Sequence, residues 1–258
     1  MKATYYILLL LIVSACKKNE PAIPTNSELR LQRIKSEDGR LQNEFQYRPD
    51  GKALLQKSYS PSRKTPDEIR YFYDEQGQLA KIETSTLGHL SCAACEGPAM
   101  KFVQTFEYNA AGQVAQTLHQ QENGSLTNRW THEYDGSGRL VRRSSTAPTG
   151  VKGNYVTYDY DSRGNMVKIE TFAADGRLTN RDTYQYDARL NPFQPVYLGS
   201  YIAFFRSPNN VVRTKSEFLS PNGGPTSEGS VRYDYDLTTG YPVRAEYENG
   251  SVSVFEYK

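Results

Sequence analysis

Two cysteines that lie three residues apart, Cys92 and Cys95, are the side chains best suited to redox or metal chemistry. A disulfide between them would close a short loop, as expected in a compartment that oxidises thiols. His89 precedes them at the same spacing, which would give zinc three ligands, one fewer than a structural site uses. A redox motif needs a helix N-terminus, which the surrounding Gly, Ala and Ser residues do not predict. The disulfide is the favoured interpretation, with a metal or redox site as alternatives, and we predict no cofactor and no metal.

Histidine and aspartate are the residues that could provide acid–base catalysis. We expect His119 and His132 to be solvated strand positions, because neither lies in a recognisable nucleophile motif. A catalytic pair of carboxylates must lie within about 5 to 10 Å of each other, whereas capping of a turn explains each aspartate of the repeated pattern singly. These aspartates are Asp74, Asp135, Asp161, Asp187 and Asp236. We therefore predict no catalytic residue.

Tyrosine is the most unusual feature of the composition, with 20 Tyr and 10 Phe against one Trp. Six tyrosines recur at equivalent positions and should lie on one face of a sheet. They form either a buried core or a partly exposed strip that holds sugar rings or a peptide strand. The residues of this candidate binding strip are Tyr47, Tyr73, Tyr108, Tyr134, Tyr160 and Tyr186.

The tyrosines belong to a repeated unit of the form aromatic-x-Tyr-Asp-x-x-Gly-x-apolar. Its second aromatic residue falls at positions 47, 73, 108, 134, 160, 186, 235 and 257, so the spacings are 26, 35, 26, 26, 26, 49 and 22. We interpret the 35 as one period with a nine-residue insertion, and the 49 as two periods with one degenerate unit. A fixed period over most of the chain predicts one repeat domain across residues 28–258.

Each unit predicts a β-hairpin. Asp161 can accept a hydrogen bond from the backbone N–H two residues on, and Gly164 can supply the left-handed residue of a bulged turn. This register places Tyr160 opposite Met166. The same count pairs Tyr73 with Leu79, Tyr108 with Val114 and Tyr134 with Leu140.

Half a period later, further turn signals occur at 38–39, 123–124, 175–176 and 249–250, where Asp or Asn precedes Gly. Each repeat therefore contains two strands and two turns. The sequence predicts an all-β fold, an antiparallel meander of about 26-residue two-strand repeats. We expect 14 to 18 strands in one rolled or twisted sheet, and no amphipathic helix.

The N-terminus carries an export signal. A run of nine apolar residues at 5–13 follows Met1 and Lys2, and it is too short to span a bilayer. Residues 13–16, Val-Ser-Ala-Cys, resemble the lipobox of bacterial lipoproteins. The resemblance implies a signal peptide over 1–15, a lipidated Cys16, and a location at the outer membrane, since Lys17 rather than Asp follows the cysteine. Residues 16–27 are polar and contain Pro, which predicts a flexible tether.

The repeat resembles the YD-repeat (Rhs-type) family, whose signature is Tyr-Asp-x-x-Gly-Arg-Leu. Residues 134–140, Tyr-Asp-Gly-Ser-Gly-Arg-Leu, match it fully, and residues 160–166 match it nearly. The likeness covers about residues 28–258 and implies an architecture of β-hairpins. The chain is too short to form the closed shell of the large Rhs toxins and has no C-terminal toxin domain, so the resemblance implies no toxin activity and no catalytic residue.

The balance of basic and acidic residues limits the classes of partner that the protein could bind. Thirty-one basic and twenty-nine acidic residues give a net charge of +2, which argues against a nucleic-acid partner. A membrane-spanning barrel is disfavoured by strand charges such as Arg70, Lys81, Arg142 and Arg143. We expect a non-catalytic, lipid-anchored protein of the cell envelope that binds or scaffolds, on the periplasmic or the cell-surface side. Its partners would be the membrane, through the lipid, and a carbohydrate or protein ligand. The alternative function is that of a hydrolase, which would cleave envelope polysaccharide or peptide with carboxylates in a groove.

Overall fold

The computed structural model describes residues 29–258, except residues 62, 64, 88–98, 197–198 and 221–222. It contains sixteen strands and one short helix, within the predicted range of 14 to 18 strands. The elements are β1 (Leu31–Ser36), β2 (Leu41–Tyr47), β3 (Ala53–Ser58), β4 (Asp67–Tyr73), β5 (Leu79–Leu87), β6 (Ala99–Tyr108), β7 (Val114–Gln121), β8 (Leu126–Tyr134), β9 (Leu140–Thr146), β10 (Lys152–Tyr160), β11 (Met166–Phe172), β12 (Leu178–Leu190), α1 (Ala203–Arg206), β13 (Asn209–Phe218), β14 (Thr226–Tyr235), β15 (Pro242–Tyr247) and β16 (Val252–Tyr257).

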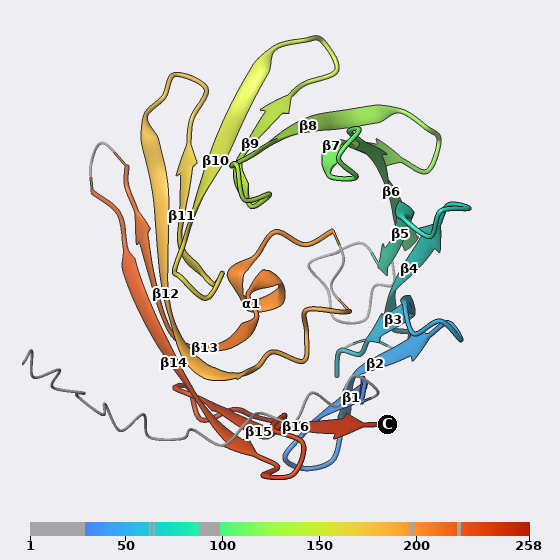
Figure 1. Ribbon diagram of the computed structural model, residues 1–258, viewed down its shortest axis with the longest axis vertical. Coiled ribbons are helices and arrows are strands. Elements are labelled where there is room, and N and C mark those ends of the chain that lie inside the picture. The colour runs from blue at the N-terminus through green and yellow to red at the C-terminus, as the bar shows by residue number, and fades with distance from the viewer. Residues whose placement is uncertain (1–28, 62, 64, 88–98, 197–198, 221–222) are drawn as a thin grey trace, which may run out of the picture.

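The sixteen strands form one antiparallel meander that closes into a barrel (Figure 1). The last strand, β16, pairs with β1, with Ile34 opposite Phe255. Both side chains are buried inside the barrel, so the closing pair belongs to the core. The prediction of an all-β meander is confirmed, but the expectation of a rolled or twisted open sheet is wrong. Closure satisfies the backbone groups that an open sheet would leave unpaired at its two edges.

The predicted hairpin turns are confirmed in detail. Tyr160 lies opposite Met166, with a register shift beside it. The backbone N–H of Arg163 donates to the carboxylate of Asp161 at 2.9 Å. Gly164 has a φ of 86°, the left-handed conformation that the turn requires. The three other predicted pairs, Tyr73–Leu79, Tyr108–Val114 and Tyr134–Leu140, have the same register.

The repeated tyrosines connect neighbouring hairpins. The hydroxyl group of Tyr134, at the end of β8, donates to the carbonyl of Val114, the first residue of β7, at 2.9 Å. Tyr160 donates likewise to the carbonyl of Leu140 at 2.8 Å. The equivalent contacts are Tyr47–Leu31, Tyr73–Ala53, Tyr108–Leu79, Tyr186–Met166 and Tyr257–Pro242. Each repeat is thus hydrogen-bonded to the one before it by a side chain as well as by its strands.

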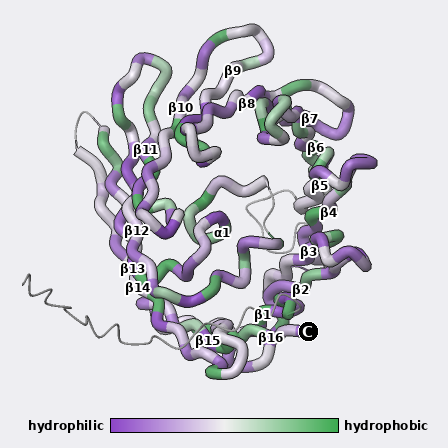
Figure 2. The backbone as a smooth tube through the Cα atoms, viewed as in Figure 1, coloured by the Kyte–Doolittle hydropathy of each residue, from purple (hydrophilic) through white to green (hydrophobic). Residues whose placement is uncertain are grey.

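Alternate residues of each strand face the inside and the outside of the barrel, so polar and apolar residues are interspersed along the backbone (Figure 2). In β4, Ile69 and Tyr71 pack in the interior, while Arg70 between them is exposed. The outer face carries nine ion pairs between residues directly opposite each other on adjacent strands. They are Arg33–Glu44, Arg33–Glu256, Lys57–Glu68, Arg142–Glu133, Lys168–Asp159, Arg181–Glu170, Arg181–Glu217, Arg232–Glu246 and Arg244–Asp234.

The connection from β12 to β13 lies inside the barrel (Figure 1). We call its described residues, 191–196 and 199–208, the plug. Val196 packs with Phe45 and Phe255, and Ala203 of α1 packs with Tyr158 and Met166. The spacing of 49 residues between Tyr186 and Tyr235 is therefore one repeat, β13 and β14, plus the plug, and the prediction of a second, degenerate repeat is wrong. Within the described part of the chain, no helix is long and apolar enough to cross a membrane.

Candidate functional site

A buried asparagine in the turn between β10 and β11, Asn165, holds the chain where it leaves the plug and enters β13. The Asn165 side chain is fully buried, and its amide group donates to Asp161 at 2.9 Å and to Asn209 at 3.0 Å. The backbone N–H of Asn209 donates back to the amide oxygen of Asn165 at 3.0 Å. The Asn165 side chain itself is removed from water, where an unpaired amide group would be costly. These contacts fix the point at which the plug returns to the barrel wall.

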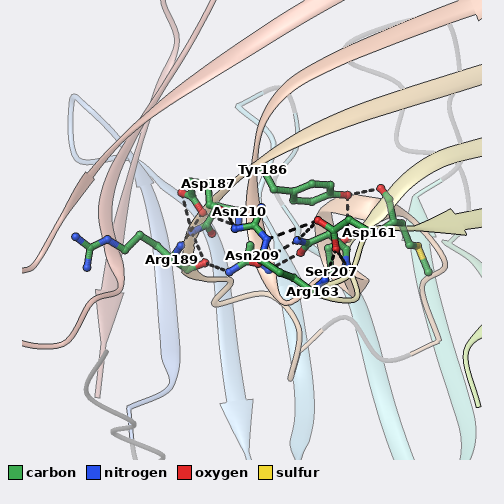
Figure 3. Close-up of polar contacts among 10 residues, drawn as sticks. Asp161, Arg163, Tyr186, Asp187, Arg189, Ser207, Asn209 and Asn210 are labelled. Atoms are coloured by element: carbon green, nitrogen blue, oxygen red, sulfur yellow. Dashed lines mark hydrogen bonds and ion pairs between the residues drawn. The ribbon is translucent and has the colours of Figure 1, made fainter. Parts of the chain in front are cut away.

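Ser207 makes a second attachment from the same end of the plug (Figure 3). Its hydroxyl group accepts the backbone N–H of Met166 at 3.0 Å and donates to the hydroxyl group of Tyr186 at 2.9 Å. Tyr186 in turn donates to the carbonyl of Met166. A repeated tyrosine that connects two hairpins elsewhere therefore also holds the plug at this position.

The two ends of the plug are joined to each other through Asn191. Its amide nitrogen donates to the carbonyls of Phe204 and Ser207, at 2.7 and 2.9 Å, and its backbone N–H donates to Pro208. Beside it, Asp187 accepts hydrogen bonds from the backbone N–H of Asn210 and from the hydroxyl group of Tyr235. The plug is thus a fixed part of the fold rather than a loosely held loop.

An aromatic and basic cluster faces the plug from β8 and β9. The Arg143 guanidinium lies between two rings, 4.5 Å from the centroid of Trp130 and 3.7 Å from that of Tyr201, a plug residue. The His132 ring lies 5.1 Å from the Tyr201 ring. Arg143 therefore faces inward, unlike its neighbour Arg142, and it does not count among the outer charges that the sequence suggested.

Burial lowers the pKa of His132 to about 4, and Arg143 acts in the same direction, while the backbone of Ala115 partly opposes them. The side chain is only 8% exposed, so the expectation of a solvated strand position is wrong for His132. Burial also lowers the pKa of His119, in the adjacent strand. Among the described residues, the His132 ring nitrogens, Nε of Arg143 and Oγ1 of Thr117 are buried without a hydrogen-bond partner. This cluster combines a neutral imidazole with a permanent cation inside the barrel.

Five of the six predicted strip tyrosines are the last residues of strands that lead into hairpin turns, and the sixth, Tyr186, lies within β12. Each of the six hydroxyl groups donates to a backbone carbonyl. Ligand binding by this strip stays a prediction.

Four of the predicted aspartates, Asp74, Asp135, Asp161 and Asp236, cap their turns. The prediction of a turn is wrong for Asp187, which lies within β12 and accepts hydrogen bonds from Asn210 and Tyr235. Cys16, Cys92 and Cys95 lie outside the described residues. In the part of the chain that is described, no group of three or more His, Cys, Asp or Glu side chains could hold a metal ion.

Sequence reasoning missed the plug contacts and the inward cluster. Ser207, Asn209 and Asn210 follow one another around a proline, and such a run is commonly a surface loop. The available signal was the spacing of 49 residues between Tyr186 and Tyr235. It exceeds one period by 23 residues, and these extra residues indicated an insertion between two strands. The inward direction of His132 and Arg143 follows from their alternation with the outer pair Glu133 and Arg142, and the strand register alone predicts it.

No family model matches this chain, and no curated protein is similar to it in sequence. Among solved structures, a porin-like protein from Bacteroides uniformis is 14% identical, with a TM-score of 0.44 over 79% of this chain and 96% of that protein. A porin-like protein from Bacteroides vulgatus is 12% identical, with a TM-score of 0.44 over 89% of this chain and 99% of that one. TcdB2-TccC3 without its hypervariable C-terminal region is 12% identical, with a TM-score of 0.27, and the match covers 87% of this chain and 16% of that one. At these scores the likenesses carry no conclusion about what this chain does.

Proposed function

We propose that this chain is a non-catalytic, lipid-anchored protein of the cell envelope, in which a plugged β-barrel acts as a binding or scaffolding module. The lipid would be attached at Cys16, and residues 16–27 would tether the barrel to the outer membrane. The barrel would stand on the periplasmic or the cell-surface side, with its partner bound by the inner face or the rim.

The charged outer face is the observation that carries this proposal. Barrels that span a membrane present an apolar band to the lipid. Here the outer face carries the nine cross-strand ion pairs, and the buried clusters of aliphatic and aromatic residues lie inside the barrel. The aromatic residues Phe72 and Tyr155 on the outer side are each covered by a basic side chain, Lys81 and Arg142. Such a face favours contact with water. Anchoring would then be the task of the N-terminal lipid rather than of the strands.

The contacts of the turn aspartates support a non-catalytic role over a hydrolase. A general acid in a glycoside hydrolase needs a raised pKa. The backbone N–H of Arg139 instead lowers the pKa of Asp135, and that of Thr239 lowers the pKa of Asp236. Both carboxylates are therefore ionised at neutral pH and engaged with the backbone of their own turns.

Membrane fractionation of a Cys16→Ser variant tests the anchoring. We expect wild-type protein in the membrane fraction with a modified N-terminus, and the variant either released or left with its signal peptide uncut. A wild-type protein that carries an unmodified N-terminus, with fractionation that the substitution does not change, would refute the proposal. Extraction at high pH adds a control, because it removes proteins held to membranes by charge alone.

A further inference from the structure

A recess of about 400 Å³ opens to solvent between the plug helix α1, the strands β13 and β14, and the turn between β15 and β16. We propose that this recess binds one ring of a neutral saccharide. The inference deepens the proposed function, on which it rests, by giving the binding module a ligand class. A recess of this volume is within the range of small-molecule sites.

Two aromatic residues, Phe204 and Tyr247, line the recess. Phe204, in α1, is held in place by an edge-to-face contact with Tyr184, with ring centroids 6.4 Å apart. Tyr247 packs against the core and begins a tight turn, in which its N–H donates to Ser251 at 2.9 Å. Both rings are thus positioned by the fold before any ligand arrives. Flat aromatic faces suit the apolar C–H face of a sugar ring.

Gly229 keeps the floor of the recess open. It lies in β14 directly opposite Thr214, on the face where Val231, two residues later, is buried in the core. A Cβ atom at Gly229 would lie 3.1 Å from Oγ1 of Thr214, and any longer side chain would project into the space beneath Phe204 and Tyr247. Glycine within a strand often marks a place where a ligand or another backbone comes close.

The polar groups at the recess select for hydroxyl groups and against negative charge. Thr214, Asn249 and Glu248 supply a hydroxyl, an amide and a carboxylate, which together can donate to and accept from sugar hydroxyls. Among the described residues that line the recess, Glu248 is acidic and none is basic, while the side chain of Glu228 alternates with Gly229 and faces the outer side of β14. A phosphate or a carboxylate ligand would meet repulsion, so the uncharged saccharide is the class that fits.

The test is a titration of the full-length protein in detergent with maltotriose, cellotriose and chitotriose, followed by calorimetry or ligand-observed NMR. Trigalacturonate is the acidic probe. We expect at least one neutral trisaccharide to bind with a Kd between about 1 μM and 1 mM, and trigalacturonate to bind at least about tenfold more weakly. Gly229→Phe should weaken binding by at least about tenfold.

Thr226→Phe is the matched control, because it adds the same side chain to the same strand on the outer, exposed face and should leave binding unchanged. Phe204→Leu keeps an apolar side chain but removes the flat ring, so it serves if Gly229→Phe fails to fold. The proposal is overturned if no neutral trisaccharide binds, if trigalacturonate binds equally well, or if folded Gly229→Phe and Phe204→Leu both bind as the wild type does. If the wild-type protein is anchored through Cys16 but binds no saccharide, this inference alone is overturned and the proposed function stands.

Discussion

Substitution of Gly164 measures how much stability is lost when a residue other than glycine occupies the left-handed position of the repeated turn. Its φ of 86° is in the left-handed region, and a Cβ atom there would have no heavy atom within 4 Å. Gly164→Ala therefore introduces no clash, and its whole cost is the backbone strain of a left-handed L-residue, about 1 to 2 kcal/mol. For a domain of this size, about 2 to 4 °C is lost per kcal/mol. We expect the melting temperature to fall by about 2 to 8 °C.

Gly136, in the turn between β8 and β9, provides the matched control. It also has open space around the position of a Cβ atom, but its φ is outside the left-handed region. Gly136→Ala should be neutral or should stabilise the fold by up to about 1 kcal/mol, because it restricts the unfolded chain. Thermal unfolding followed by circular dichroism distinguishes the two. Equal melting temperatures for the two variants would contradict the assignment of the cost to the left-handed turn residue.

Three further predictions concern the cysteines, the tyrosine contacts and the buried histidine. Replacing Cys92 and Cys95 together by Ser should cost at most about 1 kcal/mol, because the loop that they close is short; unreduced protein should weigh two hydrogens less, and stoichiometric zinc would contradict this. Tyr134→Phe should cost about 1 kcal/mol in chemical denaturation, the net value of one hydrogen bond; an unchanged midpoint would mean that the contact contributes nothing. Because the pKa of His132 is about 4 in the folded state against 6.5 as its ordinary value, the unfolded chain takes up a proton first as the pH falls. Stability should therefore be lost between about pH 6.5 and 4, and a denaturation series in which His132→Asn keeps the same pH dependence would refute this.

Much of the local structure could be predicted from the repeat alone. The pairing of Tyr160 with Met166 follows from a count of turn residues, because a hairpin's register is set by its loop length and by the position of its left-handed glycine. The same count worked for Tyr73, Tyr108 and Tyr134. The capping role of Asp161 follows from its position two residues before the N–H group that it accepts.

Closure and the plug could not be predicted in this way, because both depend on contacts between residues far apart in the sequence. The pairing of β1 with β16 depends on the total number, tilt and stagger of the strands, none of which one repeat encodes. The plug is held by single polar contacts such as Asn165 with Asn209, which are 44 residues apart. The binding recess depends on where α1 comes to rest against β14, so Phe204 and Gly229 gave no signal as sequence features.

The closing strand pair has a consequence for how the chain can be rearranged. Arg30 and Lys258 exchange backbone hydrogen bonds of 2.9 and 3.0 Å, so the described chain ends where it begins. A circular permutant that links residue 258 to residue 30 and opens the exposed turn at 147–151 keeps every strand pair. In the natural order, β1 and β16 form the strand pair with the longest sequence separation, because the ring cannot close until β16 is available. The permutant makes β16 and β1 a local hairpin and makes β9 and β10 the long-range closing pair, so the same barrel should close at a different place in the ring.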